Sequence, residues 1–358
     1  MSERTAPILP GRLGHPNMTL AEDPRADPRM IAALTPLGIG GPVEPFPLTV
    51  DDPLDQLHAY ADEGEQGFGA LGDALLTGVE PVAGVARSVE IITGVDGNDV
   101  TLYISRPEEA DGPLPGILHT HGGGMVFLEA AAGNYQRWRD ELAATGLVVV
   151  GVEFRNASGK HGRHPFPAGL NDCSSALQWM HDHRSDLGID KIVVSGESGG
   201  GNLALATTLK AKRDGKLDQI DGVYAQCPYI SGAYANPPAE LPSLTENDTY
   251  FIDCAMAGVL VKLYNPDGAN ATNPLAWPYH AGPDDLAGLP PHVISVNQLD
   301  PLRDEGLAYF TKLAAAGVTV NSRTVNGTCH AGDCLLRAAM PEVYLSTIRD
   351  IKGFADSL

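Results

Sequence analysis

Short apolar runs alternate with segments of helical periodicity from about residue 88 to the end of the chain, and this alternation limits the possible folds. The runs at 117–120 and 147–152 are short and largely apolar, which is typical of strands buried on both faces of a sheet. Further strands are predicted at 191–195, 222–225, 293–296 and 318–325. Helices are predicted at 135–144, 167–183, 201–212, 304–315 and 341–354. This order predicts a mostly parallel sheet covered by helices on both faces.

Other segments depart from the alternation. Two β-branched runs at 88–92 and 100–105 flank a turn at 96–98 and predict a hairpin. Residues 1 to about 50 are rich in Pro, Gly and Asp and predict an arm with a short helical signal at 30–34, whereas 54–76 predicts one or two short helices interrupted by glycines. A loop-rich insertion at 231–277 contains one predicted helix at 256–264.

Charge and cysteine content exclude several classes of function. The chain has 24 Lys and Arg against 45 Asp and Glu, a net charge of −21, which disfavours binding to nucleic acids and anionic membranes. Residues 1–16 contain no apolar run of the kind a signal peptide needs, so a cytoplasmic location is expected. The five cysteines form no C-x-x-C pair, and we expect reduced thiols.

The sequence Gly-Glu-Ser-Gly-Gly at 196–200 matches the pattern G-x-S-x-G. It follows the predicted strand 191–195 and opens a predicted helix, the setting that a nucleophile elbow requires. Gly196 and Gly200 leave room for a tight turn, and the helix N-terminus favours developing negative charge. Ser198 is therefore the candidate nucleophile. The alternative is a closely packed, glycine-rich turn such as a phosphate-binding loop.

A second glycine motif, His-Gly-Gly-Gly at 121–124, comes directly after the predicted strand 117–120. Three consecutive glycines let backbone N–H groups face a substrate oxygen, as an oxyanion hole requires, and the N–H of Gly199 would add a further donor. We expect His121 to hold the shape of this loop and not to transfer protons. A flexible loop without a binding role is the alternative.

A serine nucleophile needs a histidine base, and the histidine needs a carboxylate. Hydrolases with a nucleophile elbow supply these groups later in the chain, in the order Ser, Asp, His. His330 follows the predicted strand 318–325, and Asp300 follows the predicted strand 293–296. Asp304 and Asp333 are the alternative carboxylates.

Three further features carry weaker signals. His161 and His164 lie three residues apart, but their own segment supplies no carboxylate or thiol at ligand spacing, so no metal site is expected. Cys329 stands beside His330, yet no elbow surrounds it, and a small loop residue is the better interpretation. Glu197 either orients part of the site or fills the variable position of its motif.

These residues resemble the hormone-sensitive lipase family of α/β-hydrolase esterases. The resemblance rests on the motif at 121–124, on Gly-Glu-Ser-Gly-Gly-Gly-Asn-Leu at 196–203 and on Asp-Pro-Leu-Arg-Asp-Glu-Gly at 300–306, and it covers about residue 85 to the C-terminus. It implies an α/β-hydrolase catalytic domain at 85–358. It also implies an N-terminal arm and cap helices at 1–84, with the insertion 231–277 belonging to a helical cap over the pocket.

The resemblance also implies roles for individual residues. Ser198, Asp300 and His330 would be nucleophile, acid and base, and three N–H groups would form the oxyanion hole, those of Gly122, Gly123 and Gly199. His121, Gly124, Gly196 and Gly200 would support the motifs. The segments 154–158 and 330–332 differ from the usual family patterns Tyr-Arg-Leu-Ala-Pro and His-Gly-Phe, which leaves substrate size and acyl preference open.

The expected activity is hydrolysis of short- to medium-chain carboxylic esters, including lactones, through an acyl-enzyme. It needs no metal and no organic cofactor, and the expected partner is a small-molecule ester. The alternatives are a lactonase or amidase with the same triad, and a non-catalytic binding protein of the same fold. A homodimer or higher homo-oligomer is expected because relatives often pair through a late sheet edge.

Overall fold

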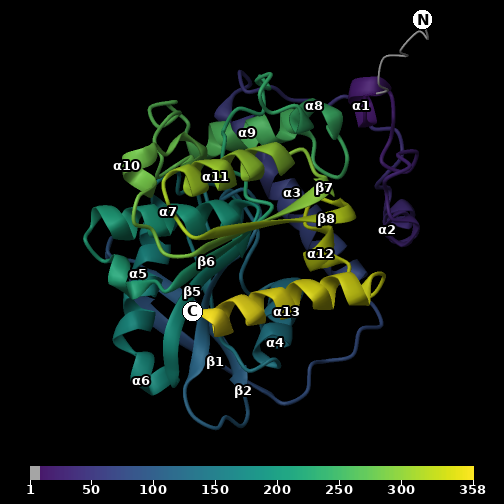
Figure 1. Cartoon of the computed structure of the whole chain (residues 1–358). Helices are drawn as coiled ribbons and strands as arrows, with labels where there is room; N and C mark the ends of the chain where they lie inside the picture. Colours follow the sequence, from purple (N-terminus) through teal and green to yellow (C-terminus); the bar gives the residue numbers. More distant parts are fainter. Residues whose placement is uncertain (1–8) are drawn as a thin grey trace, which may run out of the picture.

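The computed structural model describes residues 9–358 (Figure 1). Residues 1–8, where the predicted arm begins, lie outside the described residues. One sheet has the strand order β1-β2-β4-β3-β5-β6-β7-β8. Its strands are β1 (Val85–Thr93), β2 (Asp99–Pro107), β3 (Leu114–Thr120), β4 (Val148–Glu153), β5 (Ile189–Glu197), β6 (Gly222–Gln226), β7 (His292–Leu299) and β8 (Val320–Cys329).

Strand pairing confirms the mostly parallel sheet. β1 pairs antiparallel with β2, and β2 antiparallel with β4, whereas every pair from β4 onward along the sheet is parallel. The predicted hairpin is present, and its turn is closed by the Gly94 N–H, which donates to the Asn98 carbonyl at 2.7 Å. β8 starts two residues later than predicted and continues to Cys329, so that it ends directly before His330.

Helices cover both faces of the sheet (Figure 1). The α-helices of the described chain are α1 (Gly11–Gly14), α2 (Pro28–Leu34), α3 (Leu54–Leu75), α4 (Gly133–Ala143), α5 (Ala168–Asp182), α6 (Arg184–Leu187), α7 (Gly199–Arg213), α8 (Ser243–Glu246), α9 (Cys254–Tyr264), α10 (Pro283–Leu286), α11 (Arg303–Ala315), α12 (Gly332–Leu335) and α13 (Pro341–Ser357). Short 3-10 turns lie at Thr35–Leu37, Leu217–Gln219 and Pro278–His280.

The core is divided by the sheet because neighbouring residues of a strand point to opposite faces. Ile117 packs in one cluster with residues of α4 and α13, whereas Leu118 packs in another with residues of α5, α7 and α11. Val193 and Val194 of β5 are divided in the same way. The largely apolar strands predicted from the sequence are therefore buried on both faces.

The N-terminal arm and α3 depart in part from the prediction. α3 is one continuous helix of 22 residues, so its glycines do not interrupt it. A glycine in a helix costs about 1 kcal/mol, which the packing of buried residues such as Leu57 and Ala61 offsets. The arm packs through Leu20, Met30 and Leu34 against residues at the ends of β7 and β8. No helix of the described chain is long and apolar enough to cross a membrane.

Candidate active site

Four parallel strands of the sheet each end one residue before a residue singled out in the sequence. β3 ends before His121, β5 before Ser198, β7 before Asp300 and β8 before His330. The carboxyl ends of parallel strands meet at one edge of a sheet, where open α/β sheets bind their ligands. The fold thus gathers residues that are far apart in the chain at this edge.

Ser198 occupies a strained turn between β5 and α7. Its backbone angles are φ 58° and ψ −120°, and its N–H donates to the Gln226 carbonyl at 2.9 Å. A β-carbon on Gly200 would lie 2.0 Å from the Thr120 carbonyl oxygen, and one on Gly196 would lie 2.5 Å from the same atom. The flanking glycines are therefore required by close backbone approach, as a nucleophile elbow predicts.

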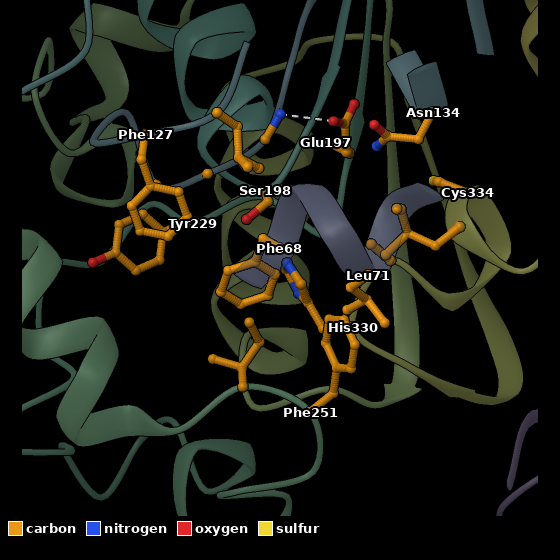
Figure 2. A pocket seen from close by; sticks show the side chains of 18 of the residues that line it. Phe68, Leu71, Phe127, Asn134, Glu197, Ser198, Tyr229, Phe251, His330 and Cys334 are labelled. Carbon is orange, nitrogen blue, oxygen red and sulfur yellow. Dashed lines mark hydrogen bonds between the residues drawn. The ribbon is translucent and has the colours of Figure 1, made fainter. Parts of the chain in front are cut away.

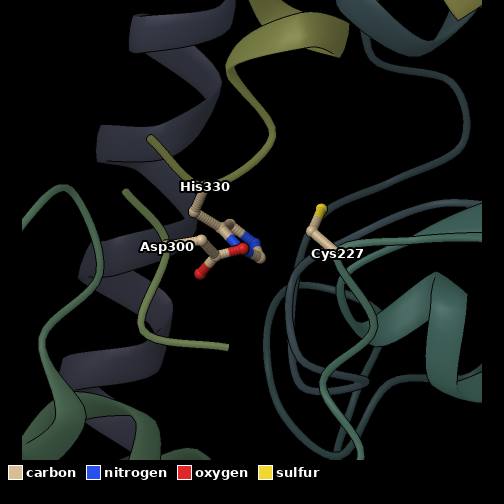
Figure 3. Close-up of side chains that lie close together, drawn as sticks. All are labelled: Cys227, Asp300 and His330. Atoms are coloured by element: carbon tan, nitrogen blue, oxygen red, sulfur yellow. The ribbon is translucent and has the colours of Figure 1, made fainter. Parts of the chain in front are cut away.

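His330 and Asp300 form a buried pair (Figure 3). His330 Nδ1 and Asp300 Oδ2 are 2.8 Å apart, and the Leu302 N–H donates to Asp300 Oδ1 at 2.8 Å. Burial lowers the pKa of His330, but the Asp300 carboxylate outweighs it and raises the pKa well above the ordinary value of 6.5. This carboxylate fixes the proton on Nδ1 and leaves Nε2 as the basic nitrogen.

The two alternative carboxylates are engaged elsewhere. Asp304 accepts the Ser243 N–H at 2.8 Å and pairs with Arg303. Asp333 accepts from Asn297 Nδ2 at 2.8 Å and from the Thr347 hydroxyl at 2.8 Å. Among Asp300, Asp304 and Asp333, it is therefore Asp300 that is hydrogen-bonded to His330.

Cys227 lies beside this pair (Figure 3). One ligand atom each from Cys227, Asp300 and His330 lie within 4.8 Å of one another. Burial raises the pKa of the Cys227 thiol, which keeps the sulfur protonated and uncharged at neutral pH. Cys227 therefore adds a small neutral neighbour to the imidazole.

One of the three predicted oxyanion donors is already hydrogen-bonded within the chain. The Gly122 N–H donates to Glu197 Oε1 at 2.7 Å, a hydrogen bond drawn as a dashed line in Figure 2. A single N–H that is bonded to a carboxylate is not free for a substrate oxygen, so in this structure Gly122 is not available as an oxyanion donor. Glu197 also accepts from His119 Nε2 at 3.2 Å. The structure thus places Glu197 against the glycine loop. The sequence alone left open whether Glu197 orients part of the site or only fills the variable position of its motif.

Three other N–H groups remain available next to Ser198. The hydrogen bonds within residues 9–358 include none donated by the backbone N–H of Gly123, Gly124 or Gly199. Gly199 packs against Gly124, because a β-carbon on Gly199 would lie 2.6 Å from the Gly124 nitrogen. The segment that departs from the usual family pattern supports this loop, since Asn156 Nδ2 donates to the Leu128 carbonyl at 2.8 Å and the Ser158 N–H to the Val126 carbonyl at 2.8 Å.

His121 is buried beneath the glycine loop. Its ring stacks on Phe154 with a centroid separation of 4.1 Å, and Nδ1 lies 2.9 Å from the Gly122 carbonyl oxygen. Burial lowers the pKa of His121 to about 3, so its ring is neutral at physiological pH. These contacts fit the predicted role in loop shape.

Ser198 and His330 line one largely apolar pocket, with Phe127 and Tyr229 to one side of the serine and Asn134 and Cys334 to the other (Figure 2). The hydrogen bonds among the described residues include none between Ser198 Oγ and His330; such bonds are often long before substrate binds. The pocket walls come mainly from α3 and the segment 251–260, which lie within the two segments expected to form a cap, although the sequence singled out none of their side chains: Phe68, Leu71, Leu75, Phe251, Ile252, Met256 and Leu260.

The thiols near the site differ in exposure. Burial raises the pKa of the Cys329 thiol well above its ordinary value, and Cys329 does not line the pocket that contains Ser198. Cys334 does line this pocket, and its sulfur lies 2.8 Å from Gln226 Nε2. No sequence pattern singled out Cys334.

A strained serine elbow, a buried His–Asp pair and free backbone N–H groups in one pocket define an α/β-hydrolase, and residues 117–332 match the model of the family described as alpha/beta hydrolase fold. The chain belongs to this family. It is 47% identical in sequence to brefeldin A esterase, a bacterial homologue of human hormone-sensitive lipase, whose structure superposes with a TM-score of 0.94 over 98% of both chains.

Two curated relatives are more distant. The esterase LipI of Mycobacterium tuberculosis is 29% identical over 87% of this chain and 89% of its own length. An arylesterase of Saccharolobus solfataricus is 34% identical over 60% of this chain and 67% of its own length. The resemblance to the hormone-sensitive lipase family that the motifs indicate is thus confirmed.

Proposed function

We propose that the chain is a serine carboxylesterase that hydrolyses short- to medium-chain carboxylic esters through an acyl-enzyme. The observation that carries this proposal is that Ser198 lies on its strained turn in the same pocket as His330, which Asp300 holds through a 2.8 Å hydrogen bond. The relatives named as esterases support an ester substrate.

The mechanism follows from the positions of these groups. His330 Nε2 removes the proton from Ser198 Oγ as the oxygen attacks the ester carbonyl, and Asp300 stabilises the imidazolium that forms. His330 then returns the proton to the departing alcohol, which leaves an acyl group on Ser198. A water molecule, activated by the same histidine, attacks this acyl group and releases the acid.

We assign the oxyanion donors to the N–H groups of Gly123, Gly124 and Gly199. None of the three donates a hydrogen bond within the described chain, and Gly199 is in close contact with Gly124. Each donor in such a hole contributes about 2.7–4 kcal/mol to transition-state stabilisation. Gly122 has a different part, because its bond to Glu197 anchors the loop that carries the donors.

The pocket sets a limit on acyl length. Its cavity volume is about 110 Å³, and its walls are mainly apolar side chains. A buried water needs roughly 10–15 Å³ of such volume, so the cavity accommodates about ten water-sized groups. This space favours a short- to medium-chain acyl group over a long one.

Hydrolysis of p-nitrophenyl esters from acetyl to dodecanoyl tests the proposed activity. We expect kcat/KM to peak at butanoyl to octanoyl esters, because each added methylene is worth about 0.8 kcal/mol only while the pocket buries it. Matched p-nitroanilides serve as the amide comparison. A rate that increases steadily to dodecanoyl, or anilides cleaved as fast as esters, would contradict the proposed substrate class.

The pH dependence tests the base. Asp300 raises the pKa of His330 above 6.5. The imidazole is neutral and able to accept a proton mainly when the pH is above this raised pKa. We expect kcat/KM to be lost as the pH falls, with a midpoint above 6.5. Initial rates on p-nitrophenyl butyrate from pH 5 to 9 measure this midpoint, and a profile flat across that range would exclude His330 as the base.

Subunit pairing stays a prediction. β8 lies at the end of the strand order, and the N-terminal arm covers the C-terminal part of its outer edge, where the Asp27 N–H donates to the Gly327 carbonyl at 2.9 Å; a second subunit would pair with the rest of this edge. A homodimer through this edge would leave the pocket at the carboxyl ends of the strands within each subunit.

A further inference from the structure

A second cluster of polar groups lies beyond the proposed catalytic residues. Glu129 follows the glycine loop, Glu153 ends β4, and His161 lies in the loop that leads to α5. One ligand atom from each of the three lies within 4.8 Å of the other two, and His161 Nε2 is 2.9 Å from Glu129 Oε1. Two carboxylates and an imidazole are a ligand set typical of zinc and neighbouring divalent metals.

A buried imidazole with an unsatisfied nitrogen faces this cluster. The Nδ1 of His121 lies 2.9 Å from the Gly122 carbonyl oxygen, which only accepts hydrogen bonds, so Nδ1 carries the ring proton. In the neutral ring Nε2 is then a bare acceptor. It is fully buried, has no hydrogen-bond partner among residues 9–358, and lies 3.8 Å from Glu153 Oε1.

Two acceptors that face each other in a buried place repel unless a positive group lies between them. Glu153 is 12% exposed, and it already accepts the N–H groups of Ala130 and Ala131. The ammonium of Lys160 pairs with Glu129, and no ion pair between Glu153 and a lysine or arginine is present among the described residues. The buried guanidinium of Arg139 lies near both His121 and Glu153, but it donates no hydrogen bond to His121 Nε2 within residues 9–358.

We propose that Glu129, Glu153 and His161 bind a divalent transition-metal ion, with Zn²⁺ as the best fit, and that the His121 Nε2 lone pair is the buried donor that completes the site. Ligand atoms of a tetrahedral zinc ion are roughly 3.3 Å apart, because each lies about 2.0–2.1 Å from the metal. The ligand atoms of Glu129, Glu153 and His161 lie within 4.8 Å of one another, and the side chains of Glu129 and His161 would have to rotate toward His121 Nε2 to reach this spacing. His161 is 40% exposed and gives the metal a path from solvent.

The site would brace the loop that carries the proposed oxyanion donors. Glu153 holds the backbone just after that loop, and His121 begins it. A metal bound here would take no part in ester hydrolysis and would instead restrain the loop from its outer side. No metal site was predicted near His161 because its own segment supplies no carboxylate at ligand spacing. Both carboxylates come from other segments of the fold.

Zinc binding by the full-length chain tests the site without any assay of activity. The protein is freed of metal with a chelator, exchanged into chelator-free buffer and titrated with Zn²⁺ in a calorimeter. We expect one equivalent to bind, and both His161→Ala and Glu129→Gln to weaken the affinity by roughly tenfold or more. Lys160→Ala should strengthen it about two- to fivefold, because it removes the competing ammonium.

Controls separate this site from incidental binding. His15→Ala removes an exposed histidine outside the cluster and should leave the affinity unchanged. Co²⁺ in place of Zn²⁺ should give the visible absorption of nitrogen and oxygen ligands, without the intense near-ultraviolet band of a thiolate. The proposal fails if Zn²⁺ does not bind at micromolar concentration, if His161→Ala binds it as tightly as the wild type, or if Co²⁺ shows thiolate ligation.

Discussion

Ser198→Ala is expected to lower kcat for p-nitrophenyl butyrate by roughly 10⁴- to 10⁶-fold, to near the uncatalysed rate, while the chain stays folded. The acyl-enzyme cannot form without Ser198 Oγ. The backbone N–H donors remain, but no serine oxygen is present to attack the ester carbonyl. The removed hydroxyl leaves the backbone of the turn intact, because that turn is held by the Ser198 N–H and its flanking glycines.

Ser195→Ala is the matched control for this variant. Ser195 lies three residues earlier on β5, is fully buried, and its hydroxyl has no hydrogen-bond partner among the described residues. The same substitution there should change kcat by less than about threefold, since the lost hydroxyl stabilises nothing. Activity of Ser198→Ala close to that of Ser195→Ala would assign the nucleophile elsewhere, and Cys334 is the thiol that lines the pocket.

The elbow was predictable because its requirements are local. A strand, a tight turn and a helix follow one another within the segment 189–213, and the glycines of the turn are visible as letters in the sequence. The placement of Asp300 and His330 after strands was predictable for a related reason: parallel strands carry their ends to one edge wherever they lie in the chain. Apolar runs were enough to locate those ends to within a few residues.

The direction of a single N–H was not predictable in this way. The sequence shows three glycines that allow close backbone approach, but it does not show which N–H faces the pocket. Gly122 faces Glu197 instead, which comes from a different strand and supplies the acceptor. A pattern within one motif could not identify this partner, because the choice between Gly122 and Gly124 depends on how β3 and β5 lie side by side.

The individual side chains that form the pocket walls could not be predicted from the sequence, for another reason. Phe68 and Leu71 belong to α3, and Leu260 belongs to α9, two helices that contact each other over the carboxyl edge of the sheet. In the sequence these residues have the ordinary spacing of a buried helical face, and nothing in that spacing separates a residue that packs in the core from one that faces a substrate. The docking of the helices decides between these roles.

Asp300→Asn is expected to reduce kcat by roughly 10⁴-fold, an effect that arises through His330 and not through contact with substrate. The carboxylate accepts the Nδ1 proton of His330, whereas an amide can present its NH₂ group to Nδ1 and favour the wrong tautomer. The variant should also move the acid limb of kcat/KM to lower pH. Burial lowers the pKa of His330, and without Asp300 the charge that raises it is gone.

Asp304→Asn distinguishes this role from a general effect of removing a carboxylate next to the site. Asp304 accepts from Ser243 and pairs with Arg303, and within residues 9–358 it forms no hydrogen bond with the imidazole. We expect its kcat to stay within about threefold of wild type, with an unchanged midpoint. Full pH profiles of both variants and the wild type are the measurement. If Asp300→Asn kept its midpoint, or if Asp304→Asn shifted it, the carboxylate that governs His330 would not be Asp300, and the order of the triad would have to be reassigned.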